Sequence, residues 1–141
     1  MEPIEFEDLP EQALLLLDSA PVIYFLENHP RLAPRFKPLF EAHDRGRLRF
    51  AVTAITIAKV LIGPLQAGDE ALARRYRAML ERWQPIALDA DTAESAARFR
   101  VSLRLKLADA MQAASALAIN AAALVTCDRD FSRVHGLRII S

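Results

Sequence analysis

Apolar residues along the chain form short runs that alternate with stretches of helical spacing. The first run, residues 13–17, holds four consecutive leucines with no polar alternation, which is typical of a strand buried on both faces. It ends at Asp18, and residues 121–126 repeat the pattern and end at Cys127-Asp128. Ligands bind just beyond the carboxyl ends of parallel strands. The pattern therefore predicts that two buried strands deliver two carboxylates to one edge of a sheet.

The same pattern predicts further strands at 48–52, 86–88 and 137–140. Helices are expected at 20–28, 36–46, 55–62, 69–83, 91–104 and 108–120. We expect Gly63-Pro64 to end the third helix, and Asp91 with Glu94 to form a capping box at the start of the fifth. Strands that alternate with helices predict a three-layer α/β/α domain around a mostly parallel sheet of about five strands.

Composition supports a folded domain. The chain has 141 residues, of which 52% are hydrophobic, so it is long enough to bury a core. No apolar run reaches the roughly 18 residues that a membrane span needs. The single cysteine excludes an internal disulfide and fits a reducing cytoplasm.

Charge is balanced in number but uneven in position, with 18 basic and 18 acidic residues. Several acids precede Arg31, the first basic residue. They are Glu2, Glu5, Glu7, Asp8, Glu11, Asp18 and Glu27. We therefore divide the chain into a flexible acidic lead-in, residues 1–11, and a basic domain, residues 12–141. A basic domain suits a polyanionic partner, although ordinary surface arginines explain the charge equally well.

Three aspartates are candidates for a metal site. Asp18 and Asp128 follow buried strands, whereas Asp109 lies at the start of a helix, where acids are common for capping reasons alone. Clustered carboxylates repel one another unless a cation lies among them. Hard oxygen ligands suit Mg²⁺ or Mn²⁺, which can activate water and hold a phosphodiester for in-line attack. The neighbouring hydroxyls of Ser19 and Thr126 could orient a carboxylate or a bound water.

Four segments resemble, in order, the motifs of the PIN-domain family: residues 15–24, 53–61, 107–118 and 124–131. Each motif is weak alone, but together they span residues 13–140. The resemblance implies a five-stranded parallel sheet flanked by helices. Within that family the chain resembles the VapC-like toxins, which implies a metal-dependent endoribonuclease, active on RNA, that is restrained by a cognate antitoxin protein and forms a homodimer.

Site residues follow from matching those motifs position by position. The resemblance implies that Asp18, Asp109 and Asp128 bind Mg²⁺ or Mn²⁺ and act in catalysis, with Asp130 as a further acid. Arginines could in addition follow RNA phosphates along one helix, although a solvated helix face explains them more simply. These arginines are Arg74, Arg75 and Arg77.

Lys59 departs from the family pattern, which places a glutamate at this position. It lies off the expected apolar stripe of the helix (Ile55, Ala58, Leu61 and Ile62), so we expect it to face the acids. There it removes a ligand and adds a positive charge beside the cation site. Three explanations remain open: a natural loss, a substitution that silences an active ribonuclease, and a tolerated change. We favour the silenced ribonuclease, with a non-catalytic RNA-binding or protein-interaction domain as the alternative.

A receiver domain of the response-regulator type also gathers acids and a lysine at strand ends. Such a domain needs an acidic pair after its first strand and a phospho-acceptor aspartate after its third. Here the first strand is followed by one acid, Asp18, beside Ser19. The sequence therefore disfavours a receiver.

Overall fold

A computed structural model describes residues 3–141. The elements follow one another as β1 (Ala13–Leu17), α1 (Ser19–Leu26), α2 (Leu32–Asp44), β2 (Leu48–Thr53), α3 (Ala54–Gln66), α4 (Glu70–Arg82), β3 (Gln84–Ile86), α5 (Ala90–Leu103), α6 (Leu107–Ala118), β4 (Ala123–Val125), a 3₁₀ helix η1 (Arg129–Arg133) and β5 (Ile139–Ile140). In the described part of the chain, every helix is too short or too polar to cross a membrane.

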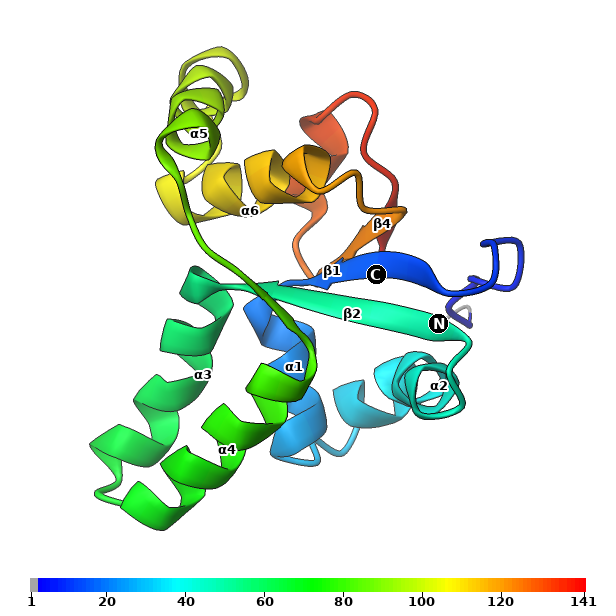
Figure 1. The fold of residues 1–141 in the computed structure, drawn as a ribbon, viewed down its shortest axis with the longest axis vertical. Coiled ribbons are helices and arrows are strands. Elements are labelled where there is room, and N and C mark those ends of the chain that lie inside the picture. The colour runs from blue at the N-terminus through cyan, green and yellow to red at the C-terminus, as the bar shows by residue number, and fades with distance from the viewer. Residues whose placement is uncertain (1–2) are drawn as a thin grey trace.

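The sheet has five strands in the order β3-β2-β1-β4-β5, and every pairing is parallel. Strand β1 lies at the centre, where Leu15 is opposite Phe50 of β2 and Ala123 of β4. Helices α1 to α4 cover one face, and α5 and α6 cover the other (Figure 1). The predicted three-layer α/β/α architecture with a parallel sheet is confirmed.

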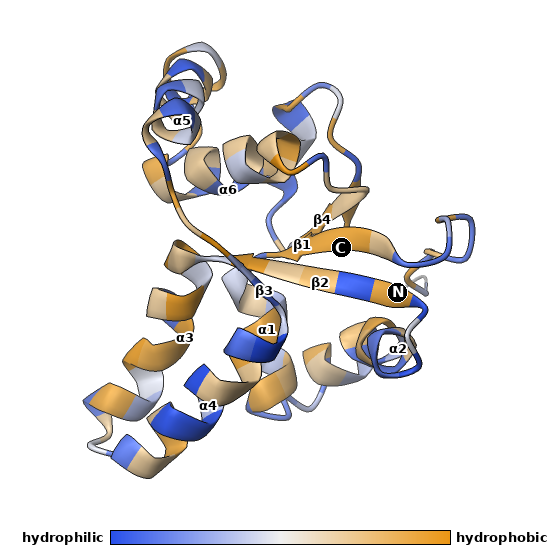
Figure 2. Cartoon of the chain, in the orientation of Figure 1, coloured by the Kyte–Doolittle hydropathy of each residue, from blue (hydrophilic) through white to orange (hydrophobic). Residues whose placement is uncertain are grey.

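The four-leucine run is apolar throughout because both faces of β1 are buried. Leu15 and Leu17 point to the core beneath α1 and α2, and Leu16 points to the second core beneath α6. All three side chains have 0% exposure. The strand is hydrophobic along its whole length in Figure 2. Such a strand has no solvent face that would call for polar alternation.

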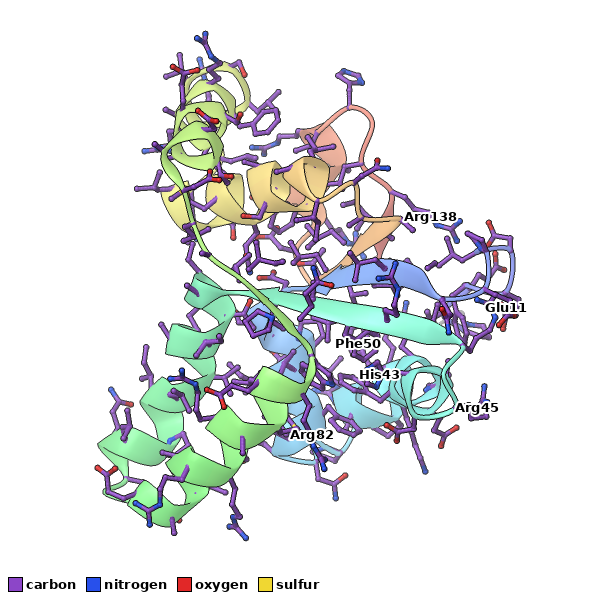
Figure 3. All side chains as sticks on the ribbon, viewed as in Figure 1. Glu11, His43, Arg45, Phe50, Arg82 and Arg138 are labelled. Atoms are coloured by element: carbon purple, nitrogen blue, oxygen red, sulfur yellow. The ribbon has the colours of Figure 1, made fainter. Side chains whose placement is uncertain are left out.

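Aromatic rings fill the core between the sheet and α2. Phe40 packs edge-on against Phe50, with ring centroids 5.4 Å apart. His43 stacks on Phe50, with ring centroids 4.4 Å apart and an angle of 16° between the ring planes (Figure 3). Trp83 packs edge-on against Phe50. The imidazole of His43 therefore serves as a packed ring rather than as a metal ligand.

Helix α3 continues through Gly63-Pro64, so the predicted stop at this pair is wrong. A proline inside a helix loses one backbone hydrogen bond, and here Pro64 lies on the buried face of the helix. The helix ends instead at Gln66, and Gly68, two residues later, has a φ of +70° that suits glycine.

The expected apolar stripe of α3 is also wrong. The buried residues of the helix are Thr56, Val60 and Pro64. Ile62 is 50% exposed and Leu65 is 48% exposed, so part of the apolar surface of the helix faces outward. Two of these three buried residues are a threonine and a proline, so a search for large aliphatic side chains does not identify the buried face.

The start of α5 and the position of β3 also differ from expectation. Asp89, rather than Asp91, caps α5, because its Oδ1 accepts a hydrogen bond from the backbone N–H of Thr92 at 2.8 Å. Strand β3 covers Gln84–Ile86, two residues earlier than predicted, and pairs with the end of β2. Both shifts move an element boundary without changing the order of elements.

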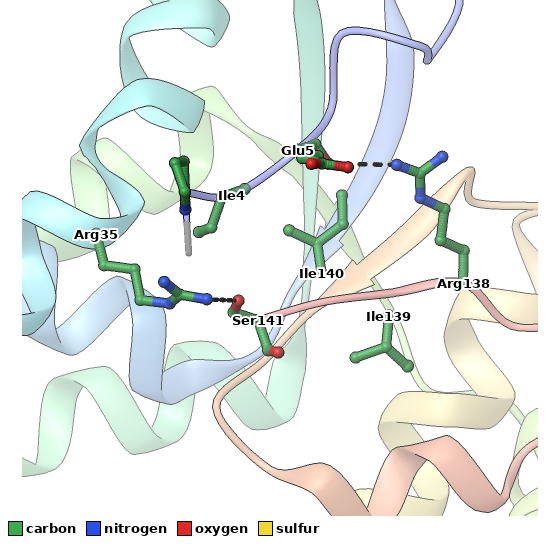
Figure 4. A pocket seen from close by; sticks show the side chains of 8 residues that line it. Ile4, Glu5, Arg35, Arg138, Ile139, Ile140 and Ser141 are labelled. Carbon is green, nitrogen blue, oxygen red and sulfur yellow. Dashed lines mark hydrogen bonds between the residues drawn. The ribbon is translucent and has the colours of Figure 1, made fainter. Parts of the chain in front are cut away.

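The acidic segment before β1 packs onto the domain, although we expected it to be flexible. Ile4, Phe6 and Leu9 are buried in the main core. Two arginines hold the acids: Arg138 pairs with Asp8 at 2.6 Å and Arg47 pairs with Glu11 at 3.1 Å. Figure 4 shows Arg138 reaching toward Glu5 beside the end of β5. Glu2 lies outside the described residues.

Candidate active site at the carboxyl edge of the sheet

Asp18 is the anchor of the candidate site. It directly follows the central strand and caps α1, since its Oδ1 accepts a hydrogen bond from the backbone N–H of Ser19 at 2.9 Å. Its own N–H donates to the carbonyl of Val125 at the end of β4, at 2.8 Å. Only 7% of the residue is exposed. Strand, helix start and neighbouring strand thus fix the position of this carboxylate.

Two side chains from distant parts of the sequence also hold Asp18. The hydroxyl of Thr126 donates to Oδ2 at 2.8 Å and so restrains the carboxylate. Among residues 3–141, the Ser19 hydroxyl makes no such contact, and Ser19 reaches Asp18 through its backbone N–H. The amide Nε2 of Gln112 donates to Oδ1 at 3.0 Å. Both carboxylate oxygens of Asp18 are therefore held by donors.

Gln112 is a residue that the sequence reasoning missed. It is 1% exposed, and it also donates from Nε2 to Thr56 at 2.8 Å and accepts from the Thr53 hydroxyl at 2.6 Å. The available signal was its position: a lone glutamine in an alanine-rich helix, three residues after Asp109 and hence on the same side.

Asp109 lies in the first turn of α6, partly buried, and shares an electrostatic environment with the other two acids. Burial raises the pKa of its carboxyl group, and the negative charges of Asp18 and Asp128 raise it further. The positive charges of Lys59 and Lys106 oppose this effect. Within residues 3–141, no hydrogen bond holds the Asp109 carboxyl group in place.

Asp128 and Asp130 form the turn that follows β4. The backbone N–H of Asp128 donates to Thr126 at 3.0 Å, which links this turn to the group that holds Asp18. Oδ1 of Asp128 accepts from the backbone N–H of Asp130 at 2.8 Å. The carboxylate of Asp130 pairs with Arg133 at 3.3 Å. Asp130 thus stabilises the turn that presents Asp128.

The donor set fits a divalent cation in chemistry and charge. Carboxylate oxygens suit Mg²⁺ or Mn²⁺. The pKa of Asp109 is raised first by burial and then by repulsion from Asp18 and Asp128, and a cation would relieve that repulsion. However, no three Asp, Glu, His or Cys side chains of residues 3–141 are grouped closely enough to hold an ion as they stand. Asp18 is fixed, so assembly around an ion would require Asp109 or Asp128 to turn.

Lys59 acts on the acids through its charge. It is exposed on α3, three residues after Thr56 of the Gln112 network, and its charge lowers the pKa of Asp109. Among the described residues, no carboxylate lies within ion-pair distance of its ammonium group. The lysine therefore makes the site less negative without forming a salt bridge to a described carboxylate.

The structure does not bring the arginine candidates to the acids. Arg74, Arg75 and Arg77 lie on α4, which starts at the end of α3 that is remote from the sheet (Figure 1). Arg77 is already paired with Glu81 at 2.8 Å.

Cys127 is a free cysteine next to the site. Burial, with the charge of Asp18, raises the pKa of its thiol to about 11. The thiol is thus protonated at neutral pH, and a protonated thiol is a poor nucleophile.

Comparison with known proteins gives a family and a set of similar folds. The model of the family described as PIN domain matches residues 15–137. A toxin–antitoxin complex from Klebsiella pneumoniae contains a chain that is 23% identical, with a TM-score of 0.71 over 90% of this chain and 96% of that one. VapBC2 from Rickettsia felis, bound to a promoter DNA fragment, is 20% identical, with a TM-score of 0.71 over 89% and 96%.

A third similar fold is VapC20 from Mycobacterium tuberculosis, a toxin that cleaves the sarcin–ricin loop. It is 13% identical, with a TM-score of 0.72 over 90% of this chain and 99% of that one. A comparison with curated proteins gives no match. At these identities the solved structures establish a shared fold.

Proposed function

This chain belongs to the PIN-domain family, and on that premise we propose that it is a metal-dependent endoribonuclease and the toxin of a toxin–antitoxin pair. The observation that carries the proposal is geometric: Asp18 and Asp128 follow the neighbouring parallel strands β1 and β4, and Asp109 lies near enough for both charges to raise its pKa, beyond the larger effect of its burial. The Klebsiella and Rickettsia structures come from toxin–antitoxin systems, and VapC20 cleaves an RNA, which supports the same assignment.

Asp18, Asp109 and Asp128 would hold the ion, Mg²⁺ or Mn²⁺. A bound ion would supply an activated water and charge stabilisation for the phosphodiester. The residues of the chain itself prepare this role. Thr126 and Gln112 orient Asp18, and Asp130 stabilises the turn that carries Asp128.

Lys59 sets the level of activity in this proposal. Where a glutamate would add a ligand, the ammonium group lowers the negative potential that attracts the ion. We therefore propose a silenced or slow ribonuclease. An enzyme of this kind would work in the cytoplasm, which the single cysteine suits, as a homodimer.

The antitoxin would be a protein with an apolar, acidic face. Helix α3 exposes Ile62 and Leu65, and Leu65 lines a groove against α4 together with Arg74 and Arg77. Apolar residues beside arginines suit an amphipathic segment whose acids pair with Arg74 and compete with Glu81 for Arg77.

The test is cleavage of a structured RNA with Mg²⁺ or Mn²⁺, run for the protein as it is and for Lys59→Glu. We expect Asp18→Asn to abolish any cleavage, because it removes the charge of the best-fixed ligand. The matched control is Asp91→Asn, an exposed acid on α5, which should change nothing. Cleavage that persists in EDTA, or in Asp18→Asn, would rule out this site.

The second candidate function is a non-catalytic domain that binds RNA or a protein. Lys59 and the unassembled carboxylates favour it. It takes precedence if neither the Lys59 protein nor Lys59→Glu cleaves RNA while both still bind RNA or the partner.

A further inference from the structure

Gln112 connects three elements through one buried amide group. It lies on α6, and its hydrogen bonds reach Asp18 at the end of β1 and two threonines, Thr53 and Thr56, at the start of α3. We propose that Gln112 is a positioning residue that holds Asp18 in the orientation that receives the metal ion. The inference rests on the proposed function and assigns one residue a role in it.

Hydrogen positions in this network follow from the donors and acceptors. Both hydrogens of the Gln112 Nε2 are used, one by Oδ1 of Asp18 and one by Oγ1 of Thr56. The Thr56 hydroxyl donates onward to the carbonyl of Leu17 at 3.2 Å, and the Thr53 hydroxyl donates to Oε1 of Gln112. Each donor therefore has one acceptor.

This directionality fixes which end of the amide faces Asp18. A flipped amide would place Oε1 at 3.0 Å from a carboxylate oxygen, where two acceptors repel. It would also leave the Thr53 hydroxyl, 0% exposed, facing an N–H group. A single orientation of Gln112 is compatible with its neighbours, so the residue can transmit a fixed geometry.

The contact matters most for Oδ1 of Asp18. Oδ2 is held by Thr126, and Oδ1 has the backbone N–H of Ser19 and the amide of Gln112. Without Gln112, the one donor to Oδ1 that remains among residues 3–141 is the backbone N–H of the adjacent Ser19, which moves with Asp18. Groups that orient a metal ligand in this way typically change metal affinity or activity by roughly 10- to 100-fold when they are removed.

Gln112 also sets distances between the elements that carry the other site residues. Asp109 is three residues earlier on α6, and Lys59 is three residues after Thr56 on α3. Because Gln112 is 1% exposed, it cannot touch an RNA substrate. Its role is therefore to position and not to react.

The test compares Gln112→Met with Ser115→Ala. The methionine side chain is similar to glutamine in length and volume but has no amide group. Ser115 lies on the same helix, is 1% exposed, and its hydroxyl has no hydrogen-bond partner among the described residues, so its loss is a matched control. Both proteins are first shown to be folded by circular dichroism. Mn²⁺ affinity is then measured from the electron paramagnetic resonance signal of free Mn²⁺, with Lys59→Glu as the common background.

We expect Gln112→Met to bind Mn²⁺ about tenfold or more weakly, and Ser115→Ala to match the parent. In RNA cleavage, kcat should fall with KM unchanged, because Gln112 lies away from the substrate surface. Equal Mn²⁺ affinity in Gln112→Met and the parent would overturn the inference and leave the proposed function standing. Absence of Mn²⁺ binding in all proteins would instead overturn the proposed function, and with it the site that Gln112 serves.

A second pair of variants covers the case in which Gln112→Met does not fold. Thr53→Val removes the hydroxyl that fixes the Gln112 amide, and Thr53→Ser restores it. We expect weaker Mn²⁺ binding for Thr53→Val and recovery for Thr53→Ser. The same affinity in both would contradict a role for the orientation of Gln112.

Discussion

Lys59 is the residue whose replacement should increase activity most. We expect Lys59→Glu to add a carboxylate and remove a positive charge, and so to increase Mg²⁺ affinity and RNA cleavage by tenfold or more, or about 1.4 kcal/mol. Lys59→Ala serves as the control, because it removes the charge without adding a ligand and should give a smaller gain. If the Lys59 protein already cleaves as fast as Lys59→Glu, the fourth carboxylate is dispensable.

Asp109 should make the stability of the metal-free protein depend on pH. Its pKa is raised in the folded state, so the folded protein holds this proton more tightly than the unfolded chain. Stability is therefore lost as pH rises from the ordinary aspartate range through the raised pKa. We expect Asp109→Asn to be more stable than the parent at pH 7 in EDTA, with the difference shrinking at lower pH, as measured by urea denaturation.

A parent protein that is the more stable of the two at pH 7 would show that Asp109 has a favourable partner in its ionised form. Added Mg²⁺ offers a second comparison. An ion that binds Asp109 should stabilise the parent and leave Asp109→Asn nearly unchanged.

The sequence predicted where Asp18 and Asp128 lie, but it did not predict the role of Gln112, which supports Asp18. Asp18 and Asp128 follow apolar strands, so a local pattern places both at the same edge of the sheet. Gln112 has partners 94 and 59 residues away along the chain, and no local pattern encodes such contacts. A polar residue in an apolar helix signals a buried contact, but it does not identify the partner.

At the scale of elements, the burial of β1 could be predicted from the sequence, whereas the buried face of α3 could not. The run of leucines in β1 leaves one interpretation, because a strand without polar positions must be buried on both faces. Helix α3 has apolar residues on more than one side, so the choice of the buried face depends on what packs against it. Thr56 is buried because it reaches Gln112 and Leu17, which a hydrophobicity count cannot show.

The exposed side of α3 provides a prediction about the partner. We expect the double variant Ile62→Asp, Leu65→Asp to lose binding to the antitoxin, because it places charge on the apolar surface. Since both residues are about half exposed, the fold should persist. Val101→Asp on α5, where Val101 is 81% exposed, is the matched control. Binding is measured by co-purification with the cognate antitoxin, and equal loss in both proteins would argue against an α3 interface.

At the scale of the whole molecule, the acidic segment is part of the core. We expect Leu9→Ala to lower the free energy of unfolding by about 2–4 kcal/mol, because it empties a site that is 7% exposed. Glu7→Gln, an exposed change in the same segment, should stay within about 0.5 kcal/mol of the parent. Urea denaturation measures both, and a Leu9→Ala value near that of Glu7→Gln would show that the segment detaches in solution.

The sheet order also determines when the candidate site forms during translation. Strand β1 leaves the ribosome first, but its neighbour β4 comes more than a hundred residues later, with Leu15 opposite Ala123. The side chains that hold Asp18 are 94 and 108 residues away from it. The carboxylate can therefore be held in place only after residues 18–126 have all been synthesised. For the ribonuclease proposed above, this order delays activity until β4 and Thr126 have left the ribosome.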